Sequence, residues 1–293
     1  MDNVPDMYRR TAPADLAEAS VSDGADSLDA FRHGQDTIRE LVVAEVGDVT
    51  GRSVLHLRCR SGLDTLSWAR RGARHVVGLD ALEPAVEAAR ELAADLGLGP
   101  ERAAFVRAGV YEAAEAAPDD AYDIVHTGAG TLSRLPDLQR WAETAASLVA
   151  PGGFLHLAEF HPLIDLFGDE VSARIVRDYL SQNTWAEEST ELDAGFDDSA
   201  IHHPVGEVVT AVAAAGLRID FLREHEVARF QRFGSLEPSS PEAGAAERGA
   251  SESGASEPRS ADSPESGVRR PWLPTQRRAA PLMYSLRATR DRR

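Results

Sequence analysis

The chain has 293 residues, 43% of them hydrophobic, which is enough for one large α/β domain or two small ones, with a sizeable core. The formal net charge is −17 and the sequence pI about 4.9, so nucleic acid and anionic lipid are both disfavoured as partners. Cys59 is the only cysteine, which excludes an intramolecular disulfide. The start of the chain has no secretory pattern, and no stretch is long and apolar enough to cross a membrane. We therefore expect a soluble cytoplasmic protein, either a monomer or a homodimer.

The predicted elements of the first half alternate between strands and helices. Residues 1–27 are polar and acidic and are expected to be mobile, and residues 28–46 predict a helix. Strands are then predicted at 53–57, 75–80, 102–108, 122–128 and 154–160, and helices at 63–72, 83–98 and 136–153. This alternation predicts a doubly wound, mostly parallel sheet with helices on both faces.

The second half is less regular. An amphipathic helix is predicted at 161–185, a helix at 206–217 and strands at 218–227 and 281–289. Residues 235–270 are rich in Ser, Glu, Pro, Ala and Gly, and this composition predicts a disordered insertion. Because strands flank the insertion, we expect it to interrupt a hairpin of the core at 28–234, which the terminal segment 271–293 completes.

The first two predicted strands have the positions that a nucleotide site requires. Asp80 ends the second strand, eighteen residues after Gly62, where a carboxylate can accept hydrogen bonds from ribose hydroxyls. Asp80 as a mere helix N-cap is the alternative. The turn "RCRSG" lacks the G-x-G-x-x-G pattern that lets a backbone approach a pyrophosphate, which argues against a nicotinamide cofactor. A cofactor without phosphate has no such requirement.

The stretch "LHLRCRSGLDTLSWARRGA" resembles the class I S-adenosylmethionine-dependent methyltransferases. The resemblance is strongest to a bacterial, actinobacterial-type subgroup whose first motif reads LHLxCxxGxDTLSxARxGA. It extends through "YDIVHTGAGTLSRLPDLQRWAETAASLVAPGGFLHLAEFHP" and "PLMYSLRA", and covers roughly residues 28–230 and 271–289. It implies a Rossmann-like fold with a seven-stranded sheet and S-adenosyl-L-methionine as the cofactor.

The resemblance also implies site residues. Those expected to bind the cofactor are His56, Cys59, Gly62, Asp80, Ala81, Val110, Tyr111 and Thr127. Simpler roles stay open, since Gly62 could be an ordinary turn glycine, Cys59 a packing residue and Tyr111 the start of a helix. Three positions depart from the family pattern: Arg58 and Arg60 replace Gln and His, and Gly109 stands where many relatives carry an acid or amide.

Two histidines are candidates for residues that act on the methyl acceptor. His161 follows the fifth predicted strand, and His203 precedes the helix at 206–217, so each could act as a base or orient the acceptor, with a purely structural role as the alternative. We expect Phe31 and residues 161–203 to cover the binding site of the methyl acceptor, and we call them the acceptor cover. No metal-ligand spacing such as H-E-x-x-H is present, so no metal is expected.

The sequence thus predicts methyl transfer from S-adenosyl-L-methionine to a small molecule, with oxygen as the first acceptor atom considered and nitrogen as the next. The alternative is a non-catalytic or degenerate S-adenosylmethionine-binding protein of the same fold, motivated by Gly109, Arg58 and Arg60. A nicotinamide oxidoreductase ranks third because the glycine fingerprint is missing.

Overall fold

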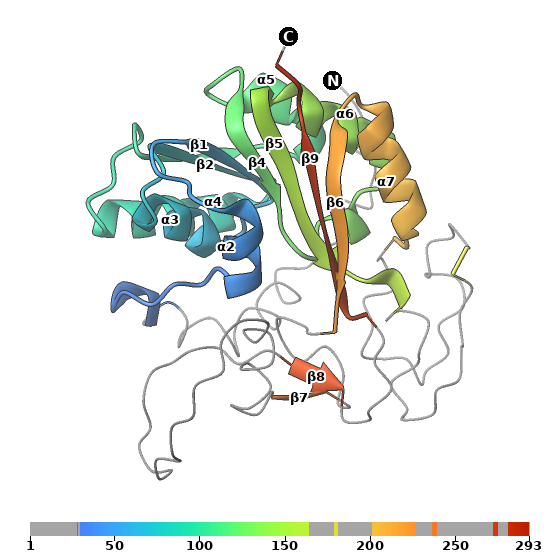
Figure 1. Cartoon of the computed structure of the whole chain (residues 1–293). Coiled ribbons are helices and arrows are strands. Elements are labelled where there is room, and N and C mark those ends of the chain that lie inside the picture. Colours follow the sequence, from blue (N-terminus) through green and yellow to red (C-terminus); the bar gives the residue numbers. More distant parts are fainter. Residues whose placement is uncertain are drawn as a thin grey trace, which may run out of the picture.

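The centre of the molecule is a seven-stranded sheet with the order β3-β2-β1-β4-β5-β9-β6 (Figure 1). The computed structural model describes residues 28, 30–163, 179–180, 201–226, 236–238, 272–274 and 281–292. The strands of this sheet are β1 (Ser53–Leu57), β2 (His75–Asp80), β3 (Ala103–Arg107), β4 (Tyr122–Thr127), β5 (Val149–Phe160), β6 (Arg218–His225) and β9 (Met283–Thr289). β1 to β5 pair in parallel, and β9 lies antiparallel between β5 and β6. The predicted doubly wound sheet is confirmed.

Helices cover both faces of the sheet (Figure 1). One face carries α2 (Glu40–Val46), α3 (Leu63–Arg70) and α4 (Glu83–Asp95). The other carries the short helices η2 (Val110–Glu112) and α5 (Ala113–Ala116) with α6 (Leu138–Ser147) and α7 (Val205–Ala214). The helix η3 (Leu132–Arg134) follows β4. Each face therefore has its own hydrophobic core, as the crossover connections of a parallel sheet require.

The burial of the strands explains why the sequence forms this sheet. All five residues of β1 are buried, as expected for a strand covered on both faces rather than one. Trp68 on α3 and Trp141 on α6 are each almost fully buried, one in each core. Aromatic side chains of this size remove about 150–250 Å² each from water, so these two tryptophans anchor the helical layers.

The predicted helix at 28–46 is wrong as a single element. Residues 30–32 are helical, a turn follows at His33 and Gly34, and α2 begins only at Glu40. Gly34 adopts a φ of 95°, a left-handed conformation that ends a helix and that glycine adopts without steric cost. Phe31, expected in the acceptor cover, is fully buried against the α2–α4 face.

The last strand of the core follows a long insertion, as the sequence predicted. β6 and β9 are antiparallel neighbours, although residues 226–282 separate them in the chain. Within that interval β7 (Leu236–Pro238) pairs antiparallel with β8 (Trp272–Pro274). The predicted mobile segment 1–27, most of the predicted cover at 161–203 and the remainder of the insertion lie outside the described residues. Among the described helices, none is long and apolar enough to span a bilayer.

Candidate active site at the carboxyl edge of the sheet

The candidate site lies where β1, β2 and β4 end. Leu57 pairs with Leu79 on β2 and with Thr127 on β4, so these three strands end at one level of the sheet. In an open parallel sheet, ligands bind beyond the carboxyl ends of the strands. The register therefore brings the turn after β1, the carboxylate of Asp80 and the end of β4 to one edge.

Three residues of the turn after β1 have the left-handed backbone conformation that glycine adopts most easily, although only one of them is glycine. Arg58, Arg60 and Gly62 have φ values of 59°, 52° and 77°, all in the left-handed region. This region costs a residue with a side chain about 1–2 kcal/mol, and such strain is concentrated at functional sites. Arg58 and Arg60 thus adopt a backbone conformation that glycine adopts more easily than residues with a side chain.

The carboxylate of Asp80 links this turn to the next one. Asp80 is 4% exposed, and its two oxygens accept hydrogen bonds from the backbone N–H groups of Arg60 at 2.9 Å and Leu82 at 3.0 Å. Each carboxylate oxygen can accept a second hydrogen bond. Asp80 does not cap α4, for which Leu82 is the N-cap and has no side-chain bond. The carboxylate therefore fixes both turns and keeps further acceptor capacity on each oxygen, and its ribose-binding role stays a prediction.

Gly62 and Cys59 serve the packing beneath the turn. A Cβ atom at Gly62 would lie 2.7 Å from both the Ala89 Cβ and the ring of Phe105, so α4 and β3 exclude a side chain there. Cys59 is buried, and its sulfur would lie 2.7 Å from a Cβ at Gly78. Burial raises the pKa of the Cys59 thiol, so it stays protonated at neutral pH and is a poor nucleophile.

The residues predicted to flank adenine lie near the start of α6. Val110 is 8% exposed within the core, and the hydroxyl of Tyr111 accepts a hydrogen bond from the Asp137 N–H at 2.8 Å. The Arg140 guanidinium lies 4.7 Å from the centre of the Tyr111 ring. Tyr111 therefore ties η2 to α6. Ala81 is exposed in the turn after β2, and the adenine-binding role of these residues stays a prediction.

The hydroxyl of Thr127 is buried and has no hydrogen-bond partner among the described residues. Thr127 ends β4 and is fully buried. Because buried hydroxyls are nearly always paired, this one is a candidate for contact with a bound ligand. A buried carboxylate with further acceptor positions, a buried hydroxyl without a partner and a turn without a phosphate cradle together suit S-adenosyl-L-methionine.

The loop after β4 is held by the carboxylate of Glu159. Glu159 on β5 is 4% exposed and accepts hydrogen bonds from the N–H groups of Gly130, Thr131, Leu132 and Phe160. Burial raises the pKa of Glu159, while these donors and the nearby Arg58 oppose that shift. Glu159 therefore anchors the loop. The only sequence signal for it was an acid within an otherwise apolar strand.

Arginine side chains connect the two turns of the site. The Arg58 guanidinium donates a hydrogen bond to the carbonyl oxygen of Gly130, and that of Arg60 donates to the carbonyl oxygen of Ala129 at 3.3 Å. Both bonds run from the turn after β1 to the loop after β4. Arg58 and Arg60 thus lie between the two turns at the carboxyl edge of the sheet.

His161 and His203 are both held by the protein. The Nε2 atom of His161 lies 2.8 Å from Glu224 Oε1, and its Nδ1 accepts a hydrogen bond from the Leu163 N–H at 3.1 Å. The Nε2 of His203 lies 2.7 Å from the Leu135 carbonyl oxygen, and burial lowers the pKa of His203. These contacts give both histidines structural roles, so a catalytic role would require His161 to release Leu163. Their assignment as bases stays a prediction.

A row of three histidines crosses the sheet at the same edge, and sequence reasoning missed its members beyond His56. His56 on β1, His126 on β4 and His156 on β5 are in register, so their side chains lie on one face. They are 4%, 5% and 0% exposed. The Nδ1 of His56 lies 2.9 Å from the Thr65 hydroxyl on α3. Single histidines at equivalent positions of separate strands become visible as a row only once the register is known.

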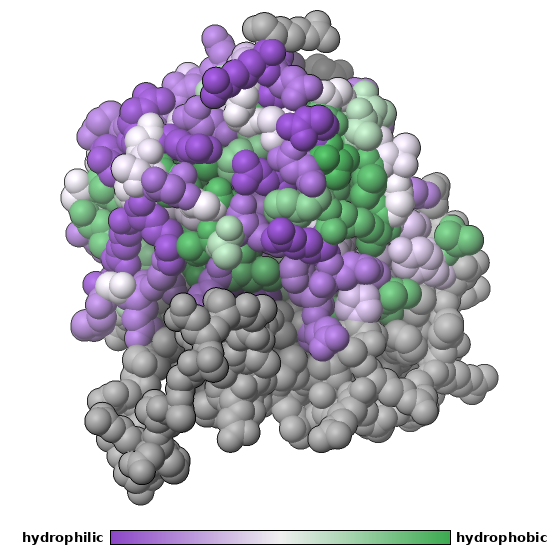
Figure 2. Space-filling model, in the orientation of Figure 1, coloured by the Kyte–Doolittle hydropathy of each residue, from purple (hydrophilic) through white to green (hydrophobic). Residues whose placement is uncertain are grey.

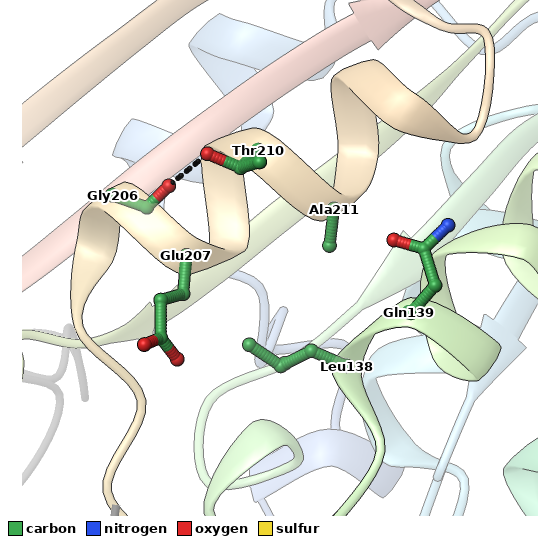
Figure 3. A pocket seen from close by; sticks show the side chains of 6 residues that line it. All are labelled: Leu138, Gln139, Gly206, Glu207, Thr210 and Ala211. Atoms are coloured by element: carbon green, nitrogen blue, oxygen red, sulfur yellow. Dashed lines mark hydrogen bonds between the residues drawn. The ribbon is translucent and has the colours of Figure 1, made fainter.

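A groove elsewhere on the molecule is not the candidate site. It measures about 300 Å³, lies between α6 and α7, and is lined by Leu138, Gln139, Gly206, Glu207, Thr210 and Ala211 (Figure 3). Figure 2 shows apolar side chains gathered over α7 on an otherwise largely hydrophilic face. Within the described residues, no three potential metal ligands form a cluster.

Comparisons with known proteins agree with this geometry. Residues 54–153 match the family model described as a methyltransferase domain. The ubiquinone biosynthesis O-methyltransferase of Neisseria meningitidis serogroup C is 34% identical over 108 residues, which are 37% of this chain. The chain matches only 44% of the length of that relative.

The solved structures show the same fold. A S-adenosylmethionine-dependent methyltransferase from Mesorhizobium loti superposes with a TM-score of 0.54 at 19% identity, covering 85% of this chain and 96% of that one. Geranyl diphosphate C-methyltransferase from Streptomyces coelicolor gives a TM-score of 0.51 at 12% identity, covering 86% and 77% of the respective chains. The chain therefore has the Rossmann-like fold of these S-adenosylmethionine-dependent methyltransferases, and the match to a methyltransferase domain lies within it at residues 54–153.

Proposed function

We propose that this protein transfers the methyl group of S-adenosyl-L-methionine to a small-molecule acceptor, most readily at oxygen and next at nitrogen. The observation that carries the proposal is the joint placement of Asp80, the unpaired buried hydroxyl of Thr127 and the left-handed turn at one sheet edge. The methyltransferase-domain match and the O-methyltransferase relative support the same reaction.

The roles of the chain's own residues follow from methyl-transfer chemistry. The cofactor, when bound, supplies an electrophilic methyl group on a sulfonium, and the acceptor displaces it in line. Asp80 would hold ribose hydroxyls, and Val110 and Tyr111 would flank adenine. The loop at residues 128–132, fixed by Glu159, would position the acceptor. Alignment of reacting atoms supplies most of the rate in such sites, with a base needed to remove the acceptor proton.

The test has two steps. S-adenosylhomocysteine should bind and raise the melting temperature, because a ligand of the native state stabilises it by mass action. Formation of S-adenosylhomocysteine from S-adenosyl-L-methionine should then be measured by mass spectrometry with a panel of hydroxyl- and amine-bearing small molecules. Absence of binding would contradict the cofactor assignment.

A non-catalytic binding protein is the second candidate. Arg58 and Arg60 favour it, because they bridge the two turns at the mouth of the site where relatives of the subgroup carry other residues. Binding without turnover across the whole acceptor panel, in both the wild type and Arg60→Gly, would support this second reading.

A further inference from the structure

Gly109 follows β3 at the edge of the sheet that carries Asp80. The last residue of β3, Arg107, pairs with Asp80, and the N–H of Ala108 donates a hydrogen bond to the Asp80 carbonyl oxygen at 3.0 Å. Gly109 has a φ of −71°, a value open to any residue, so the backbone does not require glycine there. Its missing side chain therefore reflects the surroundings of Gly109 and not its backbone conformation.

The carboxylate of Glu112 occupies the space that a side chain at Gly109 would need. The single turn of η2 brings Glu112 back toward Gly109, and the Glu112 N–H donates to the Gly109 carbonyl oxygen at 3.2 Å. A Cβ atom added to Gly109 would collide with Oε2 of Glu112 and lie 3.5 Å from its Cδ. Chain neighbours aside, no other atom of the described residues lies within 4 Å of that position. A carboxylate from residue 112 thus stands where a side chain of residue 109 would stand.

The two oxygens of this carboxylate have different surroundings. Oε1 of Glu112 lies 3.5 Å from Nη2 of Arg140 on α6, and the same guanidinium lies 4.7 Å from the centre of the Tyr111 ring. Oε2 lies over Gly109 and accepts no hydrogen bond from the described residues. The Glu112 side chain is 55% exposed, so a ligand can reach it from solvent. Arg140 therefore orients the carboxylate and leaves one oxygen available to a ligand.

Two neighbouring acids are committed to the protein. Glu83 pairs with Arg107 at 3.4 Å. Asp137 is the N-cap of α6, and its carboxylate accepts a hydrogen bond from the Arg140 N–H at 2.9 Å. Glu112 is therefore the best placed of these three acids to accept a hydrogen bond from a bound molecule.

The strand order determines on which side the base of the cofactor would lie. Asp80 on β2 is the proposed ribose contact, and the loop after β4 is proposed to position the acceptor, so the sulfonium methyl group would lie on the β4 side. The sulfur and the base are attached to opposite ends of the ribose. Because β3 is the neighbour of β2 on the side away from β4, the base would extend beyond β3, where η2 carries Glu112.

We propose that Glu112 selects adenine as the base of the cofactor, by accepting a hydrogen bond from its 6-amino group at Oε2. The proposal rests on the proposed function and deepens it. Carboxylate oxygens accept hydrogen bonds, and the 6-amino group of adenine donates them. A 6-oxo purine would instead bring a carbonyl oxygen up to the carboxylate, where two acceptors repel each other. A site built to pair with a polar group rejects an analogue that lacks it.

The first experiment compares two ligands that differ at position 6 of the purine. S-adenosylhomocysteine and S-inosylhomocysteine share the ribose and the amino-acid part, and the second has a 6-oxo group in place of the 6-amino group. Calorimetric titration of the full-length protein should show about 10-fold weaker binding of S-inosylhomocysteine, at the low end for a hydrogen bond to a charged group. Glu112→Gln should lose most of this preference, because an amide can accept from the amino group and donate to the carbonyl.

Two further variants test the position of the carboxylate. Glu115→Gln is the matched control, since Glu115 is also exposed and the change in charge is the same, and it should leave both affinities unchanged. Glu112→Ala combined with Gly109→Asp is a rescue variant, because loss of the Glu112 carboxylate opens the space for a Cβ atom at residue 109. The double variant should regain the preference for S-adenosylhomocysteine that Glu112→Ala alone has lost.

The outcomes separate this proposal from the proposed function. Failure of S-adenosylhomocysteine to bind the wild type would refute the proposed function, and the role of Glu112 with it. Equal binding of the two ligands by the wild type, or equal weakening of both in Glu112→Gln, would refute only the role of Glu112. A lower melting temperature of Glu112→Gln with an unchanged preference would refute it too, since Glu112 would then serve only its ion pair with Arg140.

Discussion

The carboxylate of Asp80 accepts the backbone N–H of Arg60 at 2.9 Å, and this bond joins the end of β2 to the strained turn after β1. The same carboxylate accepts the N–H of Leu82. One acidic side chain thus shapes both turns that surround the expected ribose. Loss of cofactor binding in an Asp80 variant could therefore arise from a lost ligand contact or from a distorted turn, and two variants are needed to separate these causes.

We expect Asp80→Ala to weaken S-adenosylhomocysteine binding by about 1.5–3 kcal/mol, the range for hydrogen bonds to a charged group. Asp80→Asn keeps one acceptor oxygen and the side-chain volume, so it should retain more of the thermal stability than the alanine variant. Calorimetric titration gives the affinity, and thermal unfolding without ligand gives the contribution of the turns. Equal affinity of wild type and Asp80→Ala would remove Asp80 from the ribose site.

Gly62→Ala should destabilise the fold by about 2–5 kcal/mol. The new Cβ would meet Ala89 and Phe105 at 2.7 Å, which adds about 1–3 kcal/mol of overpacking to the cost of about 1–2 kcal/mol for a left-handed alanine. Gly97→Ala is the matched control, because its φ of 70° is similar and no atom lies within 4 Å of the added Cβ. Urea unfolding of both variants isolates the packing component. Equal destabilisation would show that only the backbone conformation matters.

The two arginines of the first turn should respond differently to glycine. Arg60→Gly relieves a left-handed arginine on an exposed position and should stabilise the fold by about 1 kcal/mol. Arg58→Gly relieves the same strain but removes the cation near the buried carboxylate of Glu159, so its net effect should be destabilising. Chemical denaturation of the two variants compares them directly. A stabilised Arg58→Gly would mean that Glu159 needs only its backbone donors.

Stability should fall as the pH drops below about 6.5, the ordinary pKa of histidine. Burial lowers the pKa of His203 in the folded protein, whereas an unfolded chain binds the proton at the ordinary pKa. The unfolded state therefore binds more protons between the two pKa values, and the free energy of unfolding decreases as the pH falls through that window. His203→Gln should flatten this part of the melting-temperature profile. An unchanged slope between pH 5 and 7 would show that His203 is readily protonated in the folded state.

The sheet could be predicted because its signals are local. Buried strands such as β1 read as apolar runs, and glycines end the helices between them. The Asp80 position followed from its spacing after the first turn. The histidine row and the loop anchor Glu159 could not be predicted, because they depend on register between strands that lie far apart in sequence. The break at Gly34 was missed because the apolar period continues on both sides of it.

The terminal strand and the insertion before it should differ sharply in their importance. β9 lies between β5 and β6, and Tyr284, Leu286 and Ala288 are buried there, so truncation before Pro281 removes an interior strand and should abolish the folded state. Residues 239–271 contain a single large apolar side chain, Val268, and β7 and β8 pair on either side of them. Replacing 239–271 by a four-residue Gly/Ser turn should change the melting temperature little, because loop-closure entropy varies slowly with loop length. Thermal unfolding monitored by circular dichroism compares both variants with the full chain. A linker variant that unfolds, or a truncated chain that melts like the full one, would contradict the interpretation of this region as an insertion within a core hairpin.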